Sequence, residues 1–362
     1  MYVPRRKTRE VRLGPLTIGG DHPIRVQSMC STRTEDVGAT TDQIRRLEDA
    51  GCEIVRVAVP TREAADALPA IKKACRVPLV ADIHFNHRFA LKAISAGVDK
   101  VRLNPGNVGG KDRVHEVVRA AKDAGVPIRI GVNSGSVERD LLEKHGYPTP
   151  DAMVESALRH VAMLEELDFR QIIVSIKSTD TASAVKANRL FAAKTDIPLH
   201  LGITEAGLPP YASIKSAVGL GPLLLDGLGD TIRISLSVDP VEEVKVAYDI
   251  LKASGRRVTS PELIACPTCG RIEIDLEKLV KEIEAKLGGE KIPVKISVLG
   301  CAVNGPGEAR EADIGVAGAR GVGAIYRRGE LVKKVKEADL VPALLEEIAR
   351  FKAEAARTTP SP

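Results

Sequence analysis

A chain of 362 residues with 44% hydrophobic and 28% charged residues is long enough for more than one folded domain and too apolar to be disordered. No apolar run reaches the roughly 18 residues of a membrane helix, and the basic start of the chain is not followed by the apolar segment of a secretory signal, so we expect a cytoplasmic protein without a membrane partner. The net charge of +5 favours anionic ligands, but an aromatic fraction of 3% leaves few side chains to stack on bases, which disfavours nucleic acid.

Residues 1–257 repeat one unit, in which a short β-branched run is followed by a polar turn and a helical stretch. The predicted strands are Ile24–Met29, Glu53–Val59, Pro78–Ile83, Lys100–Leu103, Ile128–Val132, Gln171–Ile176, Leu199–Ile203 and Thr231–Leu236. The clearest helical patterns that follow them are Asp42–Ala50, Arg113–Ala124, Met153–Leu167 and Pro240–Ala253. Such alternation over about 250 residues predicts a TIM (β/α)8 barrel. An open doubly wound sheet is the alternative, but no G-x-G-x-x-G follows the first strand.

Charged and polar side chains gather where these strands end, which is where the catalytic residues of a TIM barrel lie. They are Arg56, Asp82, His84, Arg102, Asn104, Arg129, Asn133, Lys177, His200, Glu205, Arg233 and Ser235. Cations outnumber carboxylates in this set, and a buried cation without a partner is costly. A phosphate or diphosphate is the expected ligand, because guanidinium groups bind its oxygens in pairs. The alternative is that each cation pairs with a neighbouring carboxylate.

Beyond Arg257 the pattern becomes that of a smaller α/β domain, for which we expect residues 258–362. The predicted elements are a short strand into Cys266, a helix over Leu276–Leu287, a strand over Val294–Leu299, short strands near Ile314–Ala317 and Ala324–Tyr326, and a closing helix over Leu340–Ala356. Each of the two cysteine-bearing segments of this domain follows a predicted strand. The cysteines can therefore meet at one edge of a small sheet.

Three of the six cysteines fall in this second domain. The C-x-x-C of Cys266 and Cys269 alone fits a redox dithiol, a zinc site or an iron–sulfur site. Cys301 adds a third thiol within a glycine-rich loop, which favours an iron–sulfur cluster over zinc. A cubane cluster usually has four thiolates, so a fourth ligand is needed. Glu308 is the nearby anionic candidate, with Glu311 and an ordinary surface carboxylate as alternatives.

At these residues the chain resembles the bacterial 4-hydroxy-3-methylbut-2-en-1-yl diphosphate synthase family, in its short two-domain form. The matching stretches run in order along nearly the whole chain: Val26–Met29, Arg56–Pro60, Ala81–Asn86, Val101–Gly106, Arg129–Gly135, Leu201–Gly207, Ile264–Arg271 and Gly300–Glu308. The resemblance implies an oxidoreductase of the methylerythritol phosphate pathway of isoprenoid synthesis. Its reaction is the two-electron ring opening and dehydration of 2-C-methyl-D-erythritol 2,4-cyclodiphosphate to 4-hydroxy-3-methylbut-2-en-1-yl diphosphate, with flavodoxin or ferredoxin as electron donor.

The resemblance also assigns roles. It implies that a [4Fe–4S] cluster is held by Cys266, Cys269, Cys301 and Glu308. It implies that the diphosphate is bound by Arg56, Arg102, Arg129, Asn133, Lys177, Arg233 and Ser235. It places Asp82, His84, Glu205 and Glu308 near the reacting atoms. It further implies a homodimer in which the cluster domain of one subunit caps the barrel of the other.

Three points outside the resemblance stay open. A zinc-assisted barrel hydrolase acting on a phosphorylated small molecule is the main rival function. An RNA-binding protein with a zinc ribbon is a second rival, but Cys301 has no partner at the spacing that a zinc ribbon requires. Cys30 stands where the family pattern leads us to expect a small hydroxyl residue, and we interpret it as a buried filler.

Overall fold

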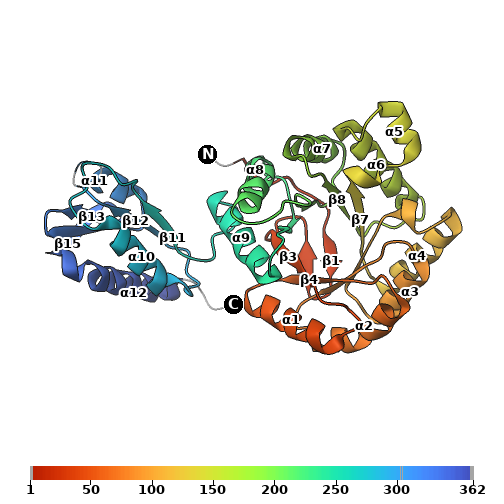
Figure 1. The fold of residues 1–362 in the computed structure, drawn as a ribbon, viewed down its shortest axis with the longest axis horizontal. Helices are drawn as coiled ribbons and strands as arrows, with labels where there is room; N and C mark the ends of the chain where they lie inside the picture. Colours follow the sequence, from red (N-terminus) through yellow and green to blue (C-terminus); the bar gives the residue numbers. More distant parts are fainter. Residues whose placement is uncertain (1–2, 302, 304, 359–362) are drawn as a thin grey trace. The chain divides into compact units, whose positions relative to one another are not determined.

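The computed structural model describes residues 3–301, 303 and 305–358. The chain divides into two compact units, Met1–Arg257 and Val258–Pro362, whose elements are labelled in Figure 1.

The first unit is a parallel barrel, which confirms the predicted TIM fold. Its strands are β3 (Arg25–Met29), β4 (Ile54–Ala58), β5 (Leu79–Asp82), β6 (Lys100–Leu103), β7 (Ile128–Asn133), β8 (Ile172–Lys177), β9 (His200–Leu201) and β10 (Thr231–Ile232). They are hydrogen-bonded in the order β8-β7-β6-β5-β4-β3-β10-β9. A bridge between Val174 and Leu199 joins β8 to β9 and closes the ring. The last two strands are shorter than the apolar runs from which they were predicted.

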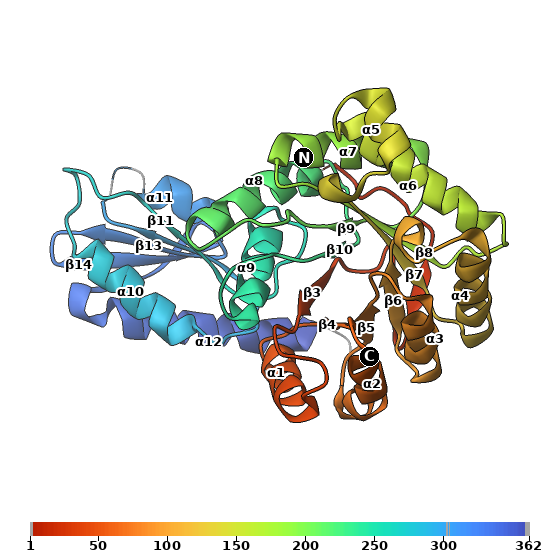
Figure 2. The ribbon, with the colours of Figure 1, turned by 45° about the vertical axis from the view of Figure 1, so that its right-hand side comes forward.

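Helices surround the strands, as Figures 1 and 2 show. They are α1 (Val37–Asp49), α2 (Arg62–Ala74), α3 (His87–Ser95), α4 (Lys111–Ala124), α6 (Pro150–Glu165), α7 (Thr181–Lys194), α8 (Tyr211–Leu225) and α9 (Pro240–Ala253), with α5 (Arg139–His145) in the loop after β7. Short polar residues begin most of them; Thr61, for example, accepts a hydrogen bond from the Ala64 N–H at the start of α2. Gly125 ends α4 at a φ of 65°, in the left-handed region that glycine adopts readily. Short 3-10 turns lie at η1 (Pro105–Asn107) and η2 (Ser134–Ser136).

A hairpin that was not predicted precedes the barrel. It pairs β1 (Val11–Leu13) with β2 (Leu16–Ile18). Its buried side chains pack on Ile54, Val80 and Ile173, which lie near the beginnings of their strands. The hairpin therefore closes the amino-terminal end of the barrel with aliphatic side chains and leaves the carboxyl end for the site.

The second unit is a five-stranded sheet in sequence order. Its strands are β11 (Glu262–Ala265), β12 (Lys295–Leu299), β13 (Ile314–Ala319), β14 (Val322–Arg327) and β15 (Glu330–Lys336), of which the first three are parallel and the last two antiparallel. The helices are α10 (Leu276–Leu287), as predicted, α12 (Leu340–Thr358) and the short α11 (Gly305–Glu308), with 3-10 turns η3 (Ala309–Glu311) and η4 (Glu337–Asp339). The core packs Ile283 of α10 and Leu344 of α12 against Val298 of β12. The edge strand β15 was not predicted.

Candidate active site

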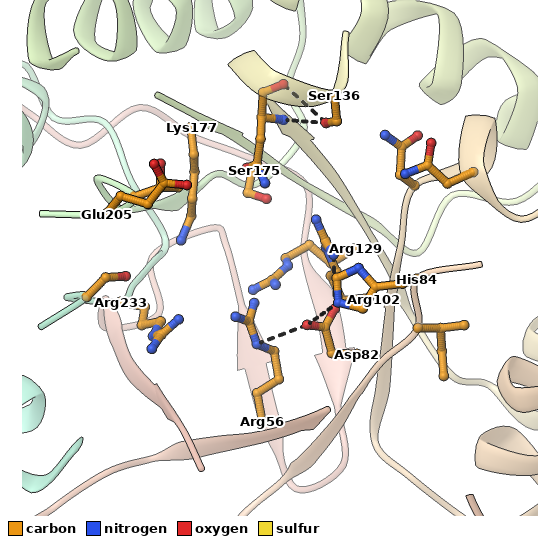
Figure 3. A pocket seen from close by; sticks show the side chains of 16 residues that line it. Arg56, Asp82, His84, Arg102, Arg129, Ser136, Ser175, Lys177, Glu205 and Arg233 are labelled. Atoms are coloured by element: carbon orange, nitrogen blue, oxygen red, sulfur yellow. Dashed lines mark hydrogen bonds and ion pairs between the residues drawn. The ribbon is translucent and has the colours of Figure 1, made fainter. Parts of the chain in front are cut away.

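A cavity of about 340 Å³ lies at the carboxyl ends of the barrel strands. Its lining residues are Arg56, Asp82, Ile83, His84, Arg102, Asn104, Asn107, Arg129, Asn133, Ser136, Ser175, Lys177, Thr204, Glu205, Arg233 and Ser235. Every barrel residue for which the family resemblance implies a role is in this set. Figure 3 shows the labelled cationic side chains converging on one space from several strands. The sequence analysis missed Asn107, Ser136, Ser175 and Thr204.

One carboxylate pairs with two of the arginines. Asp82 lies 3.1 Å from Arg102 Nη1 and 3.8 Å from Arg56 Nε. His84 Nε2 is 3.3 Å from the same carboxylate. Burial alone would raise the pKa of Asp82, but Arg56, His84 and Arg102 together hold it well below its ordinary value. Asp82 is therefore a fixed anion and hydrogen-bond acceptor at neutral pH.

A second carboxylate, outside the cavity lining, pairs with Arg233. Glu243 of α9 lies 3.0 Å from Arg233 Nη2 and is 2% exposed. The same carboxylate accepts hydrogen bonds from the Leu236 N–H and from Ser28 Oγ. Helix α9 therefore fixes the position of the arginine that directly follows β10. Three of the arginines, Arg56, Arg102 and Arg233, do pair with a carboxylate, as the alternative predicts. They share two carboxylates, those of Asp82 and Glu243.

Arg129 and Lys177 are the cations without such compensation. Within the part of the chain that the structure describes, neither forms an ion pair, and both are nearly inaccessible, at 1% and 6% exposed. Arg129 Nε and Nη1 have no hydrogen-bond partner. Burial, followed by the neighbouring cations, lowers the pKa of both side chains well below its ordinary value. A guanidinium starts from so high a pKa that Arg129 stays charged at neutral pH.

Two glycines leave room for cationic side chains of the cavity, Arg102 and Lys177. A Cβ at Gly131 would lie 2.5 Å from Arg102 Nε, and a Cβ at Gly202 would lie 2.7 Å from Lys177 Nζ. Both glycines therefore serve close approach inside the barrel. Glu205 adds a different kind of signal, because its φ of 53° is unusual for a residue with a side chain. Such backbone strain concentrates at functional sites.

The three thiols of the second unit lie at one edge of its sheet. Cys266 directly follows β11, and Cys301 follows the parallel neighbour β12. The Gly300 N–H donates a hydrogen bond to Cys266 Sγ at 3.3 Å. Cys269 is exposed, and hydrogen bonds from the backbone and side chain of Arg271 lower its pKa. The Arg271 guanidinium is also stabilised by the charges of Cys301 and Cys266, which raise its pKa. All three thiols therefore raise the pKa of one guanidinium, that of Arg271, with Cys269 contributing most.

Donor chemistry at this edge fits an iron–sulfur cluster. Thiolates are the usual ligands of such clusters, and hydrogen bonds to sulfur tune them. Glu308 is exposed at the end of α11. Among residues 3–301, 303 and 305–358, no three His, Cys, Asp or Glu side chains are close enough to hold a metal ion. Cys30 is buried in the barrel core, and burial raises its pKa to about 12.

Comparisons with known proteins agree on one family. The model of the GcpE TIM-barrel domain matches residues 8–248, and that of the GcpE protein C-terminal domain matches residues 262–350. A 4-hydroxy-3-methylbut-2-en-1-yl diphosphate synthase (flavodoxin) of Geobacillus kaustophilus is 59% identical over 352 residues, which cover 97% of this chain and 94% of that protein. The enzyme of the same name from Bacillus licheniformis is 57% identical over 350 residues, covering 97% and 95%.

A solved dihydropteroate synthase from Xanthomonas albilineans is 16% identical with a TM-score of 0.46, covering 67% of this chain and 98% of that one. So distant a likeness carries no argument about function. No helix among the described residues is long and apolar enough to cross a membrane.

Proposed function

The chain belongs to the bacterial 4-hydroxy-3-methylbut-2-en-1-yl diphosphate synthase (flavodoxin) family, whose members are iron–sulfur oxidoreductases, and we propose that its barrel cavity binds the cyclic diphosphate on which they act. The reaction is the reductive ring opening and dehydration of 2-C-methyl-D-erythritol 2,4-cyclodiphosphate. The zinc hydrolase and RNA-binding alternatives find no support, because the relatives that match 97% of the chain carry the synthase name.

The excess of cations in the cavity carries this proposal. The lining holds four arginines and one lysine but only two carboxylates, Asp82 and Glu205. Among the described residues, Arg129 and Lys177 are buried without an anionic partner. A cyclic diphosphate bears one negative charge on each phosphorus, so it supplies the two anions that these side chains lack. The ligating set is Arg56, Arg102, Arg129, Asn133, Lys177, Arg233 and Ser235.

The remaining polar residues of the cavity divide into two roles. Asp82 is already neutralised by Arg56 and Arg102, so it orients these arginines and His84 rather than donating a proton. His84 keeps its second ring nitrogen for a substrate hydroxyl. Glu205 is exposed in the cavity and has no ion-pair partner among the described residues, so it is free to exchange a proton with the oxygen that leaves as water.

In the second unit, Cys266, Cys269, Cys301 and Glu308 hold a [4Fe–4S] cluster. When bound, the cluster supplies single electrons and one iron that acts as a Lewis acid. Flavodoxin, which the relatives' names specify, is the electron donor, with ferredoxin as the alternative. Following the family resemblance, the enzyme is a cytoplasmic homodimer in which the cluster domain of one subunit covers the barrel of its partner.

Anaerobic reconstitution tests this function. Protein purified without oxygen should be brown, contain iron and bind the cyclodiphosphate, and reduced flavodoxin should drive its conversion. Lys177→Met should weaken binding by roughly 1.5–3 kcal/mol, the value of a charge-assisted hydrogen bond. Lys186→Met, at an exposed position on α7, is the matched control. Unchanged binding in Lys177→Met would remove the barrel mouth as the diphosphate site.

A further inference from the structure

Beneath the cavity, the barrel interior holds a second polar layer that does not line the cavity itself. It consists of Gln27 on β3, Lys100 on β6, His200 on β9 and Thr231 on β10, all at most 1% exposed. Lys100 lies two residues before Arg102 on the same strand, so the two side chains face the same way, one layer apart. Barrel interiors are usually filled by branched aliphatic side chains at this depth. The polar layer therefore calls for an explanation.

Lys100 is poorly satisfied in this layer. Its Nζ donates one long hydrogen bond, to Gln27 Oε1 at 3.4 Å. Among the described residues it forms no ion pair, and it is 0% exposed. Gln27 Nε2 and His200 Nε2 have no hydrogen-bond partner, while His200 Nδ1 lies 2.7 Å from Thr231 Oγ1. The layer thus has unused polar atoms around a buried amine.

Charged and titratable groups face Lys100 from the neighbouring strands and are nearly all cationic. Arg129 on β7 and Arg56 on β4 act on Lys100 directly. The cavity lining adds Asp82 on β5, Arg102 on β6, Lys177 on β8 and Arg233 directly after β10, and the layer itself adds His200 on β9. Burial, then Arg129 and Arg56, lowers the pKa of Lys100 well below its ordinary value. Burial, then Arg129 and the neighbouring lysines, lowers the pKa of His200 well below its ordinary value.

We propose that Lys100 is a neutral amine in the empty barrel and takes up a proton when a cyclic diphosphate enters the cavity above it. The lone pair of Nζ accepts the proton from solvent, and no other bond changes. The resulting ammonium is a positioning charge that acts through Arg129 and Gln27 rather than by touching the ligand. This inference rests on the proposed function of the cavity and adds a proton to its binding reaction.

Lys100 is a better proton acceptor than His200. A lysine starts from a pKa of about 10.4 and a histidine from about 6.5. Burial and cationic neighbours lower the pKa of both side chains, but lysine starts from the higher value and therefore regains a proton more readily. An incoming dianion offsets the cations and raises the pKa of Lys100 again. Gln27 Oε1 is already placed to accept a hydrogen bond from the ammonium.

Proton uptake gives the binding reaction a defined pH dependence. Because the pKa of Lys100 is higher in the bound state than in the free state, affinity is fully present below the free-state pKa. It is lost as pH rises through the bound-state pKa. Between the two values, affinity falls about tenfold per pH unit for each proton taken up. The ligand does not contribute, because each phosphorus of a cyclic diphosphate has one strongly acidic oxygen that is ionised throughout.

Calorimetry of ligand binding tests the proposal. The cyclodiphosphate is titrated into anaerobic holoenzyme without reductant, so that no turnover occurs, in two buffers of different ionisation enthalpy. The difference in heat between the buffers gives the protons taken up per site. Four proteins are compared: the wild type, Lys100→Met, His200→Gln and the exposed control Lys186→Met.

We expect proton uptake in the wild type, in His200→Gln and in Lys186→Met, and a clear loss of it in Lys100→Met. Binding without proton uptake in the wild type would overturn the inference while leaving the proposed function intact. Uptake that survives in Lys100→Met would also overturn it. Absence of binding by the wild type would overturn both. If Lys100→Met does not fold, the pH dependence of wild-type affinity and the Lys100→Gln variant decide in the same way.

Discussion

Replacing Arg129 by methionine removes a buried cation whose Nε and Nη1 have no hydrogen-bond partner in the ligand-free barrel. Methionine keeps an unbranched, flexible and largely apolar side chain without the charge, although it is shorter than arginine. The neighbouring Arg56, Arg102 and Arg233 repel the guanidinium, and only Asp82 attracts it. Replacing even a buried ion pair by well-packed apolar residues is often neutral or stabilises proteins by about 1–4 kcal/mol, and Arg129 lacks an ion-pair partner among the described residues. We therefore expect the ligand-free barrel to become more stable.

The same substitution should weaken ligand binding. Arg129 is 1% exposed and lines the cavity, so its hydrogen bonds to a diphosphate form away from water. A hydrogen bond to a charged group contributes about 1.5–3 kcal/mol, which corresponds to a loss of roughly tenfold to more than a hundredfold in affinity. A residue that serves ligand binding at the expense of protein stability shows both effects when it is replaced: a more stable free protein and a weaker affinity. A purely structural residue does not.

Two assays on the same protein check both signs. Thermal unfolding of the barrel without ligand should shift upward by about 2–4 °C per kcal/mol of added stability, and calorimetry should give the weaker affinity for the cyclodiphosphate. Arg139→Met is the matched control, because Arg139 is exposed on α5 and pairs only with Glu143 at the surface. A lower melting temperature with unchanged affinity for Arg129→Met would refute the reasoning.

Three further predictions concern the cluster and the glycines. Cys301→Ser should abolish the brown colour and the bound iron while the barrel keeps its melting temperature, and the same holds for the other two thiols; full iron content in any of these variants would contradict the cluster assignment. Glu308→Cys should keep its iron but turn over much more slowly, because a soft fourth ligand exchanges less readily than a carboxylate, whereas Glu308→Ala should lose iron. Wild-type turnover in Glu308→Cys would exclude an exchangeable role for the carboxylate. Gly131→Ala should displace the Arg102 guanidinium, since its Cβ would lie 2.5 Å from Nε, and should lower affinity more than stability. Gly221→Ala on α8, where a Cβ meets nothing within 4 Å, is the control, and equal affinities of the two variants would show that binding does not need the close approach of Arg102 to Gly131.

The barrel was readable from the sequence because its strands alternate with helices at regular intervals. Two elements were missed for physical reasons. The strands of the β1–β2 hairpin are three residues long, too short to show an alternating pattern. Strand β15 has the sequence ELVKKVK and is exposed along most of its length, so it lacks a buried face. Lysines on an edge strand also guard against pairing with other chains, which makes such a strand resemble a loop.

The sequence predicted those residues of the site that lie at the ends of strands. Because all barrel strands are parallel, residues at their carboxyl ends share one mouth, and all the predicted strand-end residues except His200 line one cavity. The pairing of Arg233 with Glu243 could not be predicted, since it joins the residue after a strand to a residue one turn into the following helix. The roles of Gly131 and Gly202 depend on distances across the barrel. Ser175 and Thr204 carry no charge to mark them.

Conversion of the cyclodiphosphate by the iron-loaded protein tests the central claim most directly. Anaerobic protein is mixed with the substrate and with flavodoxin carrying a known number of electrons, and the product is quantified. The account predicts one molecule of 4-hydroxy-3-methylbut-2-en-1-yl diphosphate for every two electrons consumed, and a strong loss of this product in Lys177→Met. Iron-loaded protein that accepts electrons from flavodoxin but leaves the cyclodiphosphate intact would contradict it.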